Sequence, residues 1–335
     1  MKYNINSVWE RFYGLLKLER PDILQIFYYA LFAGVLSLSL PLGVQSIVNL
    51  MQGSQISSSW IILVALVTLG VVFAGILQVM QMRIIETLQQ RIFTRSSFEL
   101  SYRFPKINMK ELRNHYPPEL ANRFFDTISI QKGLSKILID VPTAFIQILF
   151  VLILLSFYHP FFILFGITLL TLMYFIFRIT VRRGLETSLK ESKQKYRVAH
   201  WIQEIARSVV SFKLSGNTNL AMLKNDELVS NYLNAREAHF KVIKIQYIKM
   251  IAFKVLVTTG LLIIGGVLVL NQQMNIGQFV ASEIIILLVI ASVEKLIVSL
   301  ETLYDILTSI EKLGQVVDMD MESQEGKTPN FSSGM

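Results

Sequence analysis

Ionised residues inside apolar sequence could do chemistry, because a charge in lipid is costly and is kept for function. Glu283, Glu294 and Lys295 interrupt the last long apolar run. Glu283 lies about two turns, roughly 9 Å, past Gly277 along a helix, where it could face a substrate path or contact a neighbouring helix. Glu294 and Lys295 are adjacent, so their side chains point about 100° apart, and the alternative is that they extend to the membrane interface. We take Glu283 and Glu294 as candidates for a translocation path.

A second candidate is the triplet Gly326-Lys327-Thr328, which matches the end of a phosphate-binding loop. That loop requires another glycine five residues earlier, with a strand before it and a helix after it. Met321 stands at the glycine position, and no apolar strand precedes it. We interpret the triplet as part of a linker rather than as a nucleotide site.

Other kinds of reactive site have no counterpart in the sequence. The histidines at positions 115, 159, 200 and 239 are scattered, and no Ser-His-Asp set, zinc-ligand spacing or carboxylate pair suggests catalysis. The chain contains no cysteine, which excludes disulfides and thiolate ligands. We therefore expect no catalytic residue, metal site or cofactor site in this chain.

The composition indicates that lipid surrounds the elements that position these residues. Of 335 residues, 53% are hydrophobic and 17% are charged, which is more apolar than a soluble domain of this size could bury. The net charge of +8 does not predict nucleic-acid binding, because the basic residues form no compact surface with stacking aromatics. Residues 1–20 lack the apolar core and cleavage site of a signal peptide.

Six apolar segments are long enough to span a membrane, since about 20 residues cross roughly 30 Å of hydrocarbon. We predict an all-α integral membrane protein with spans at residues 23–48, 60–80, 138–156, 160–178, 250–270 and 276–297. The polar stretch 49–59 separates the first pair. His159-Pro160 separates the second, because a residue before proline disfavours helix. Asn271-Gln272-Gln273, with Gly277 close behind, separates the third, so that the fifth span ends near Leu270 and the sixth begins near Ile276.

The distribution of lysine and arginine predicts the orientation, because positively charged loops stay in the cytoplasm. The three short loops contain none, whereas residues 83–136 hold ten, residues 178–249 hold fourteen and residues 1–20 hold four. We expect both termini and both long loops to be cytoplasmic.

The two long loops, called the first stalk (83–136) and the second stalk (178–249), have apolar residues at helical spacing. As helical hairpins with roughly 27 residues per leg they would extend about 40 Å from the membrane. Residues 114–119, with Pro117-Pro118, predict the turn of the first stalk. In the second, the spacing predicts helix through Phe212, and Ser215-Gly216-Asn217 supplies the stop.

Before the first span, residues 1–20 form an amphipathic pattern that suits a helix lying in the membrane interface. Val8, Trp9 and Phe12 alternate with Glu10 and Arg11. The alternative is an ordinary helix covering a protein core, because helical amphipathicity does not distinguish the two.

This organisation resembles the transmembrane domain of type I ABC exporters over roughly residues 8–320. The matching motifs, in chain order, are Pro118-Glu119-Leu120 through Arg123 and Asp126; Glu204, Val209, Val210 and Lys213; Met274 to Ala281; and Ser309 to Asp318. Pro118 replaces the family's usual glycine. Leu40-Pro41-Leu42, with Gln45 and Asn49, is similar to the branch that exports peptides and proteins, including type 1 secretion and bacteriocin exporters.

The resemblance implies that two segments couple this chain to an ATPase domain. Coupling segment 1 would comprise His115, Tyr116, Pro117, Pro118, Glu119 and Arg123, and coupling segment 2 would comprise Glu204, Arg207, Val209, Phe212 and Lys213. The alternative is that both segments only end one helix and begin the next, since a Pro-Pro turn forms without a binding partner.

The resemblance also implies the domain organisation and the partners. The chain would consist of an interfacial elbow helix (1–20), a transmembrane domain (21–317) and a linker (318–335). The linker would lead to a nucleotide-binding domain that carries ATP and Mg²⁺. That domain is expected either on a separate subunit or on a further part of the same polypeptide. The partners would be a second copy, or a homologous half-transporter, in a domain-swapped dimer; the lipid bilayer of the plasma (inner) membrane; and a periplasmic adaptor. ATP hydrolysis would need the associated domain.

Two other functions remain open from the sequence. An ion-coupled secondary transporter would use intramembrane acids, although no internal repeat is evident. A membrane scaffold derived from an exporter would bind a partner through the stalks without transport.

Overall fold

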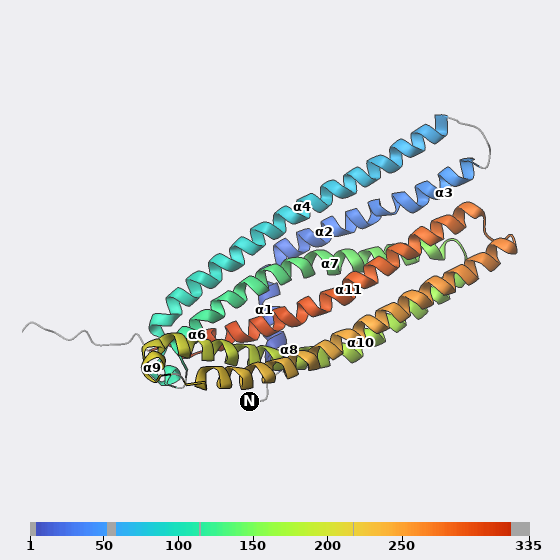
Figure 1. The fold of residues 1–335 in the computed structure, drawn as a ribbon. Helices are drawn as coiled ribbons and strands as arrows, with labels where there is room; N and C mark the ends of the chain where they lie inside the picture. The colour runs from blue at the N-terminus through green and yellow to red at the C-terminus, as the bar shows by residue number, and fades with distance from the viewer. Residues whose placement is uncertain (1–4, 52–57, 114, 217, 323–335) are drawn as a thin grey trace, which may run out of the picture.

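The computed structural model describes residues 5–51, 58–113, 115–216 and 218–322 (Figure 1). The expectations for Asn114, Asn217 and most of the linker, including Gly326-Lys327-Thr328, fall outside these residues. Across the described ranges the chain is helical apart from turns and one isolated bridge between Ile107 and Met321. The predicted all-α class is confirmed.

Eleven α-helices are present in the described part of the chain. They are α1 (Ile5–Leu18), α2 (Arg20–Ser37), α3 (Ser39–Met51), α4 (Ser58–Arg103), α5 (Met109–Leu112), α6 (Pro117–Asn122), α7 (Asp126–Ser156), α8 (Phe161–Arg207), α9 (Val209–Leu214), α10 (Leu220–Leu270) and α11 (Ile276–Val317). Short 3₁₀ turns occupy Phe104–Lys106 and Arg123–Phe125.

Six segments of the described chain are long and apolar enough to cross a membrane, which confirms the predicted number of spans. Three of the spans form only one end of a much longer helix. Helices α4, α8 and α10 have 46, 47 and 51 residues, whereas a span needs about 20. The first span is divided at Leu38, between α2 and α3, which the sequence analysis did not predict. Pro41 lies in the first turn of α3, where its missing N–H is tolerated.

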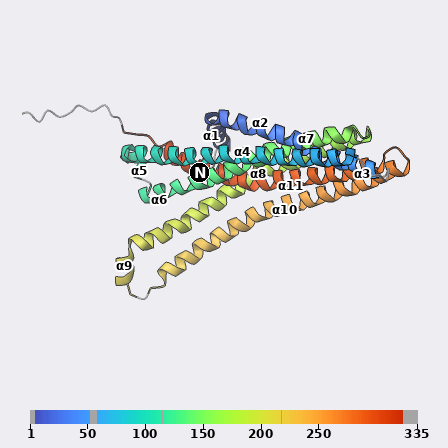
Figure 2. The same ribbon diagram turned by 90° about the horizontal axis from the view of Figure 1, so that it is seen from above.

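The long helices run side by side and extend beyond the apolar segments toward α6 and α9 (Figure 1). Viewed from above, α8 and α10 separate from α4, α7 and α11 as they approach α9 (Figure 2). The most extensive packing joins α7 to α11 and α8 to α10. The second stalk is therefore a helical hairpin that diverges from α4, α7 and α11 toward its tip.

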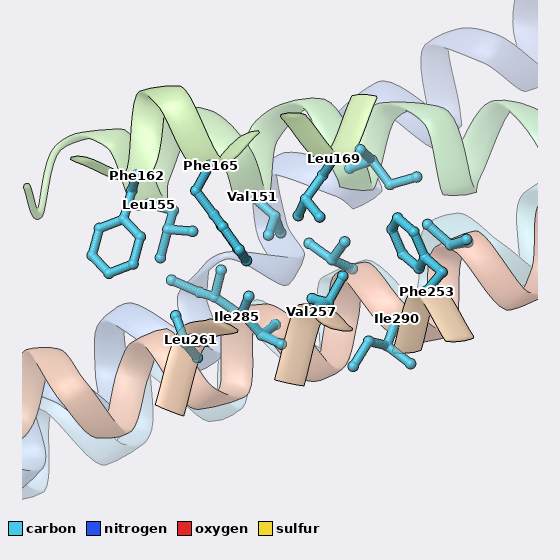
Figure 3. Close-up of a cluster of buried hydrophobic side chains, with 14 of the residues drawn as sticks. Val151, Leu155, Phe162, Phe165, Leu169, Phe253, Val257, Leu261, Ile285 and Ile290 are labelled. Carbon is cyan, nitrogen blue, oxygen red and sulfur yellow. The ribbon is translucent and has the colours of Figure 1, made fainter. Parts of the chain in front are cut away.

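Two apolar clusters hold the bundle together. One lies among α7, α8, α10 and α11, where Val151, Phe165, Val257 and Ile285 converge (Figure 3). The other lies toward the stalks and includes Tyr304, which is fully buried. Apolar faces from distant parts of the sequence meet in both, so burial of side chains fixes how the long helices align.

Helix α1 crosses the long helices near the start of α2 (Figure 1). Val8 and Phe12 are buried in the second cluster, and Arg11 forms ion pairs with Glu311, at 2.6 Å, and with Asp318. The apolar face of α1 thus packs against the core of the same chain. Tyr13 on α1 is exposed.

Two local predictions need correction. The helix predicted through Phe212 ends at Arg207, and α9 begins after Ser208, whose backbone (φ −101°, ψ 24°) leaves the helical region. Apolar spacing does not reveal this break, because each separate helix keeps the same period. Pro117 and Pro118 start α6 rather than forming the turn itself, since the first helical positions need no N–H.

Candidate coupling surface and translocation path

Coupling segment 1 lies at the tip of the first stalk, on and beside α6. Tyr116 has an extended backbone that precedes α6, and Pro117 and Pro118 fix its first turn. His115 and both prolines are exposed, whereas Tyr116 and Glu119 are half-buried. The outer face of this tip is accessible to a partner.

Coupling segment 2 lies at the tip of the second stalk. Glu204 and Arg207 end α8 and form an ion pair at 2.6 Å. Phe212 packs against Trp201 with ring centroids 6.2 Å apart, which holds α9 against α8. Val209 and Lys213 are exposed on α9.

The structure brings the two segments together within one chain. The guanidinium carbon of Arg207 lies 5.1 Å from the centroid of the Tyr116 ring. The ring of His200, on α8, lies 6.0 Å from the same ring, and its Nδ1 lies 3.3 Å from Oε2 of Glu119. A displacement of the second-stalk tip would therefore reach α6 through direct contacts.

Arg123 occupies a different position from the other residues of coupling segment 1. It is buried, and its Nη1 donates a hydrogen bond of 2.9 Å to Oε1 of Gln315 near the end of α11. Glu119 Oε1 lies 4.0 Å from its Nη2. Arg123 consequently joins α6 to α11, and a docked partner would not reach it.

A buried polar group lies beneath the segment-1 tip, where the helices extend beyond the apolar segments. The Tyr196 hydroxyl donates a hydrogen bond to Asp126, whose pKa is raised because burial outweighs that bond. Lys312 is only 6% exposed, and burial lowers its pKa to about 8. With Tyr196 on α8, Asp126 on α7 and Lys312 on α11, this group ties three helices together.

A cavity of about 380 Å³ opens between α6, α8 and α10 beside this group. Its lining includes Lys193, Arg197, Lys224, His200 and Trp201. The lining is mainly basic, with Glu119 as its acidic member.

The tip of the second stalk also carries an exposed apolar patch. Its members are Val209, Val210, Leu214, Leu220, Met222 and Leu223. Leu214 is the most exposed of them at 82%. Several exposed apolar side chains concentrated at one tip indicate an interaction surface rather than a solvated helix face.

The two candidate residues of the translocation path are in different surroundings. Glu283 is half-buried on α11, and its Oε1 is buried without a hydrogen-bond partner in the described residues. Glu294 lies 3.5 Å from Nζ of Lys254 on α10, which matches a polar contact between helices. Lys295 is exposed. Of the two acids, Glu283 has the less satisfied carboxyl group.

The described residues contain no group of three or more His, Cys, Asp or Glu side chains placed to hold a metal ion. The ionised groups of both stalk tips are arranged as pairs and contacts between helices. Such an arrangement can transmit a displacement from one helix to another.

Three residues that take part in these contacts were not predicted from the sequence: His200, Tyr196 and Lys312. His200 was one of four scattered histidines, yet it contacts both Tyr116 and Glu119. Lys312 lies more than 180 residues from Asp126 in the sequence, and only the packing of α11 on α7 brings them close. No local pattern could have predicted these contacts.

In a comparison with protein families, residues 23–293 match the model of the ABC transporter transmembrane region. The match covers 271 of 335 residues, well over half of the chain. It begins at the first span and ends within α11. A comparison with curated proteins gives no match.

Proposed function

Because the chain belongs to the ABC transporter transmembrane family, we propose that it forms the translocation pathway of an ATP-driven exporter. The observation that carries the proposal is the contact between Arg207 and Tyr116, which joins two stalk tips that extend well beyond the spans. A protein that transports without a cytoplasmic motor has no evident use for two such stalks.

In this proposal, an ATPase domain docks on the exposed surfaces of α6 and α9. The exposed side of α6 offers His115 and Pro118, and α9 offers the apolar patch that includes Leu214. Docked domains that approach one another on binding ATP would move the stalks as levers, because α4, α8 and α10 each run as one helix from a span into a stalk. Tyr116, His200 and Arg207 would make the two tips move together.

A second copy or a homologous half-transporter completes the pathway, with ATP and Mg²⁺ held by the ATPase domains. We place the stalks and both termini in the cytoplasm of a plasma (inner) membrane, because the short loops contain no lysine or arginine. A periplasmic adaptor would meet those short loops.

Export of a peptide or protein is the direction and substrate class that we propose. The first span supports it with Leu40-Pro41-Leu42, followed by Gln45 and Asn49. In the structure Gln45 accepts a hydrogen bond of 2.7 Å from the Tyr158 hydroxyl. Asn49 lies close against Gly277 at the start of α11. Glu283 would face the pathway one to two turns further along α11.

The test is ATP hydrolysis by the native-length protein, purified through this chain and reconstituted in liposomes. We expect hydrolysis by an ATPase domain that is either fused to this chain or co-purifies with it. In Leu214→Asp, a charge in the apolar patch should weaken docking, so hydrolysis and transport should no longer depend on each other. Leu233→Asp is the matched control, because Leu233 is also exposed but lies about 20 Å along α10 from its start.

A protein that purifies at its native length, hydrolyses no ATP and brings down no ATPase subunit would overturn the proposal. Uptake driven by a proton gradient alone would then favour the ion-coupled transporter. Unchanged coupling in Leu214→Asp would remove α9 from the docking surface.

A further inference from the structure

A cavity lies between α1 and α8, away from both coupling segments. Its volume is about 550 Å³. It is lined by Trp9 of α1 and by Tyr174, Phe177, Arg178, Val181, Arg182 and Leu185 of α8. The cavity thus combines three aromatic rings, an apolar floor and two arginines.

The position of the cavity along α8 matches the edge of a bilayer. Arg178 is the first charged residue after the charge-free run that ends at Phe177. From Tyr174 to Leu185 the helix rises about 16 Å, enough to reach from the upper acyl chains past the phosphate layer. Tyr174 lies on the apolar side of this boundary and Arg182 on the charged side.

The two arginines are placed to receive an anion. Arg178 and Arg182 are four residues apart, so they lie on one face of α8. Arg182 Nε lies 3.4 Å from Oε1 of Glu186, and the structure gives Arg178 no ion pair with any described residue. A guanidinium group binds phosphate with two parallel hydrogen bonds, which suits a lipid headgroup.

The aromatic and apolar lining fits the rest of a lipid. Tryptophan and tyrosine prefer the membrane–water interface, because they combine an apolar ring with a polar tip. Trp9 is held in place by Phe12, whose ring is 5.9 Å away at 84° and is itself buried. Phe177 and Val181 supply apolar surface for the first carbons of an acyl chain.

We propose that this cavity binds an anionic phospholipid, with its phosphate on Arg178 and Arg182 and its upper acyl chain against Phe177 and Trp9. The leaflet would be the cytoplasmic one, which rests on the orientation in the proposed function. The bound lipid fills the space between α1 and α8 and so fixes the N-terminal helix against the fourth span. Lipid binding requires neither ATP nor transport, so failure here is separate from failure of the exporter proposal.

The first experiment measures quenching of Trp9 fluorescence by brominated lipids. Trp60→Phe and Trp201→Phe leave Trp9 as the single tryptophan, because the chain has three. In nanodiscs of equal lipid content, we expect brominated phosphatidylglycerol to quench Trp9 more strongly than brominated phosphatidylcholine. Each arginine near an anionic surface is worth about a fivefold preference, so Arg178→Gln with Arg182→Gln should abolish most of the difference.

Arg83→Gln is the matched control. Arg83 is exposed at the equivalent height on α4, immediately after the second span, and does not line the cavity. Its loss should leave the preference for phosphatidylglycerol unchanged. An equal loss in Arg83→Gln would mean that general surface charge, rather than this cavity, selects the lipid.

Native mass spectrometry of the chain with its three tryptophans gives an independent measurement. We expect phosphatidylglycerol to remain bound to the parent protein and to Arg83→Gln, and to be lost from the double arginine variant. Equal retention of both lipids by every protein would overturn the proposal. Inorganic phosphate added in detergent, without lipid, should leave Trp9 fluorescence unchanged; a saturable change would indicate a site for a free anion instead.

Discussion

The guanidinium group of Arg207, at the end of α8, lies over the ring of Tyr116, immediately before α6, with 5.1 Å between the guanidinium carbon and the ring centroid. This cation–π contact joins the tips of stalks whose residues lie 91 positions apart in the sequence (207 − 116). Glu204 holds the guanidinium at 2.6 Å, so the contact has a fixed geometry.

Replacing Tyr116 by alanine should separate ATP hydrolysis from transport. The change removes the ring that Arg207 and His200 contact, while α6 keeps its proline start and its buried Arg123. A cation–π contact at an exposed site is worth about 0.5–1 kcal/mol, so the protein should remain folded. Transport and hydrolysis are measured together in liposomes. Tyr116→Phe is the control, because it keeps the ring, and full transport by Tyr116→Ala would contradict the coupling role.

Gly184→Ala should destabilise the fold by about 1–3 kcal/mol, the usual cost of overpacking. A Cβ at this position would lie 2.2 Å from Cζ of Tyr304, which is fully buried and cannot move aside. Thermal unfolding in detergent measures the effect. Gly166→Ala on the same helix is the control, because the nearest atom to its Cβ would be 3.5 Å away. If both variants unfold at the same temperature, α8 does not pack on α11 as described.

Asp305→Asn should stabilise the protein at neutral pH and have little effect at pH 4. Asp305 lies on α11 beyond the sixth span, exposed in a cavity that Glu191 and Lys195 also line; partial loss of hydration there, followed by the charges of Glu301 and Glu191, raises its pKa from 3.8 to about 6. The folded state therefore holds the proton more tightly than the unfolded chain does. The stability that protonation provides is complete below about pH 3.8 and is lost as the pH rises through 6.

The measurement for Asp305 is the difference in melting temperature between variant and parent across pH 4–7. It should grow between about pH 4 and pH 6 and then level off, because asparagine mimics the protonated acid. Asp226→Asn on the exposed surface of α10 is the control. A difference independent of pH would show that Asp305 does not titrate in this range.

Single cysteines should report the orientation directly, because the chain contains none. Met222→Cys, at the exposed tip of the second stalk, should react with a membrane-impermeant maleimide only when the reagent reaches the cytoplasmic side. Gln273→Cys, in the exposed turn between α10 and α11, should react from the opposite side. Labelling of intact cells and of inverted vesicles distinguishes the two. Reaction of both cysteines from one side would contradict the predicted topology.

Much of the fold was predictable because lipid imposes a strong pattern on sequence. About 20 apolar residues are needed for each span, so composition alone determined the six spans and the all-α class. Charge in the long loops predicted the orientation, and apolar spacing predicted that the stalks are helical. Helix breaks were less visible: the interruptions at Leu38 and Ser208 involve one residue each and leave the surrounding periodicity intact.

What only the tertiary structure decided is which charged groups meet. Nothing in the sequence near Glu294 identifies Lys254 as its partner, and nothing near Tyr116 indicates His200 or Arg207. These contacts depend on the rotation of each long helix about its axis, which is set by the burial of apolar side chains from several helices at once. Sequence periodicity identifies the apolar face of one helix; the packing of all of them determines what that face brings together.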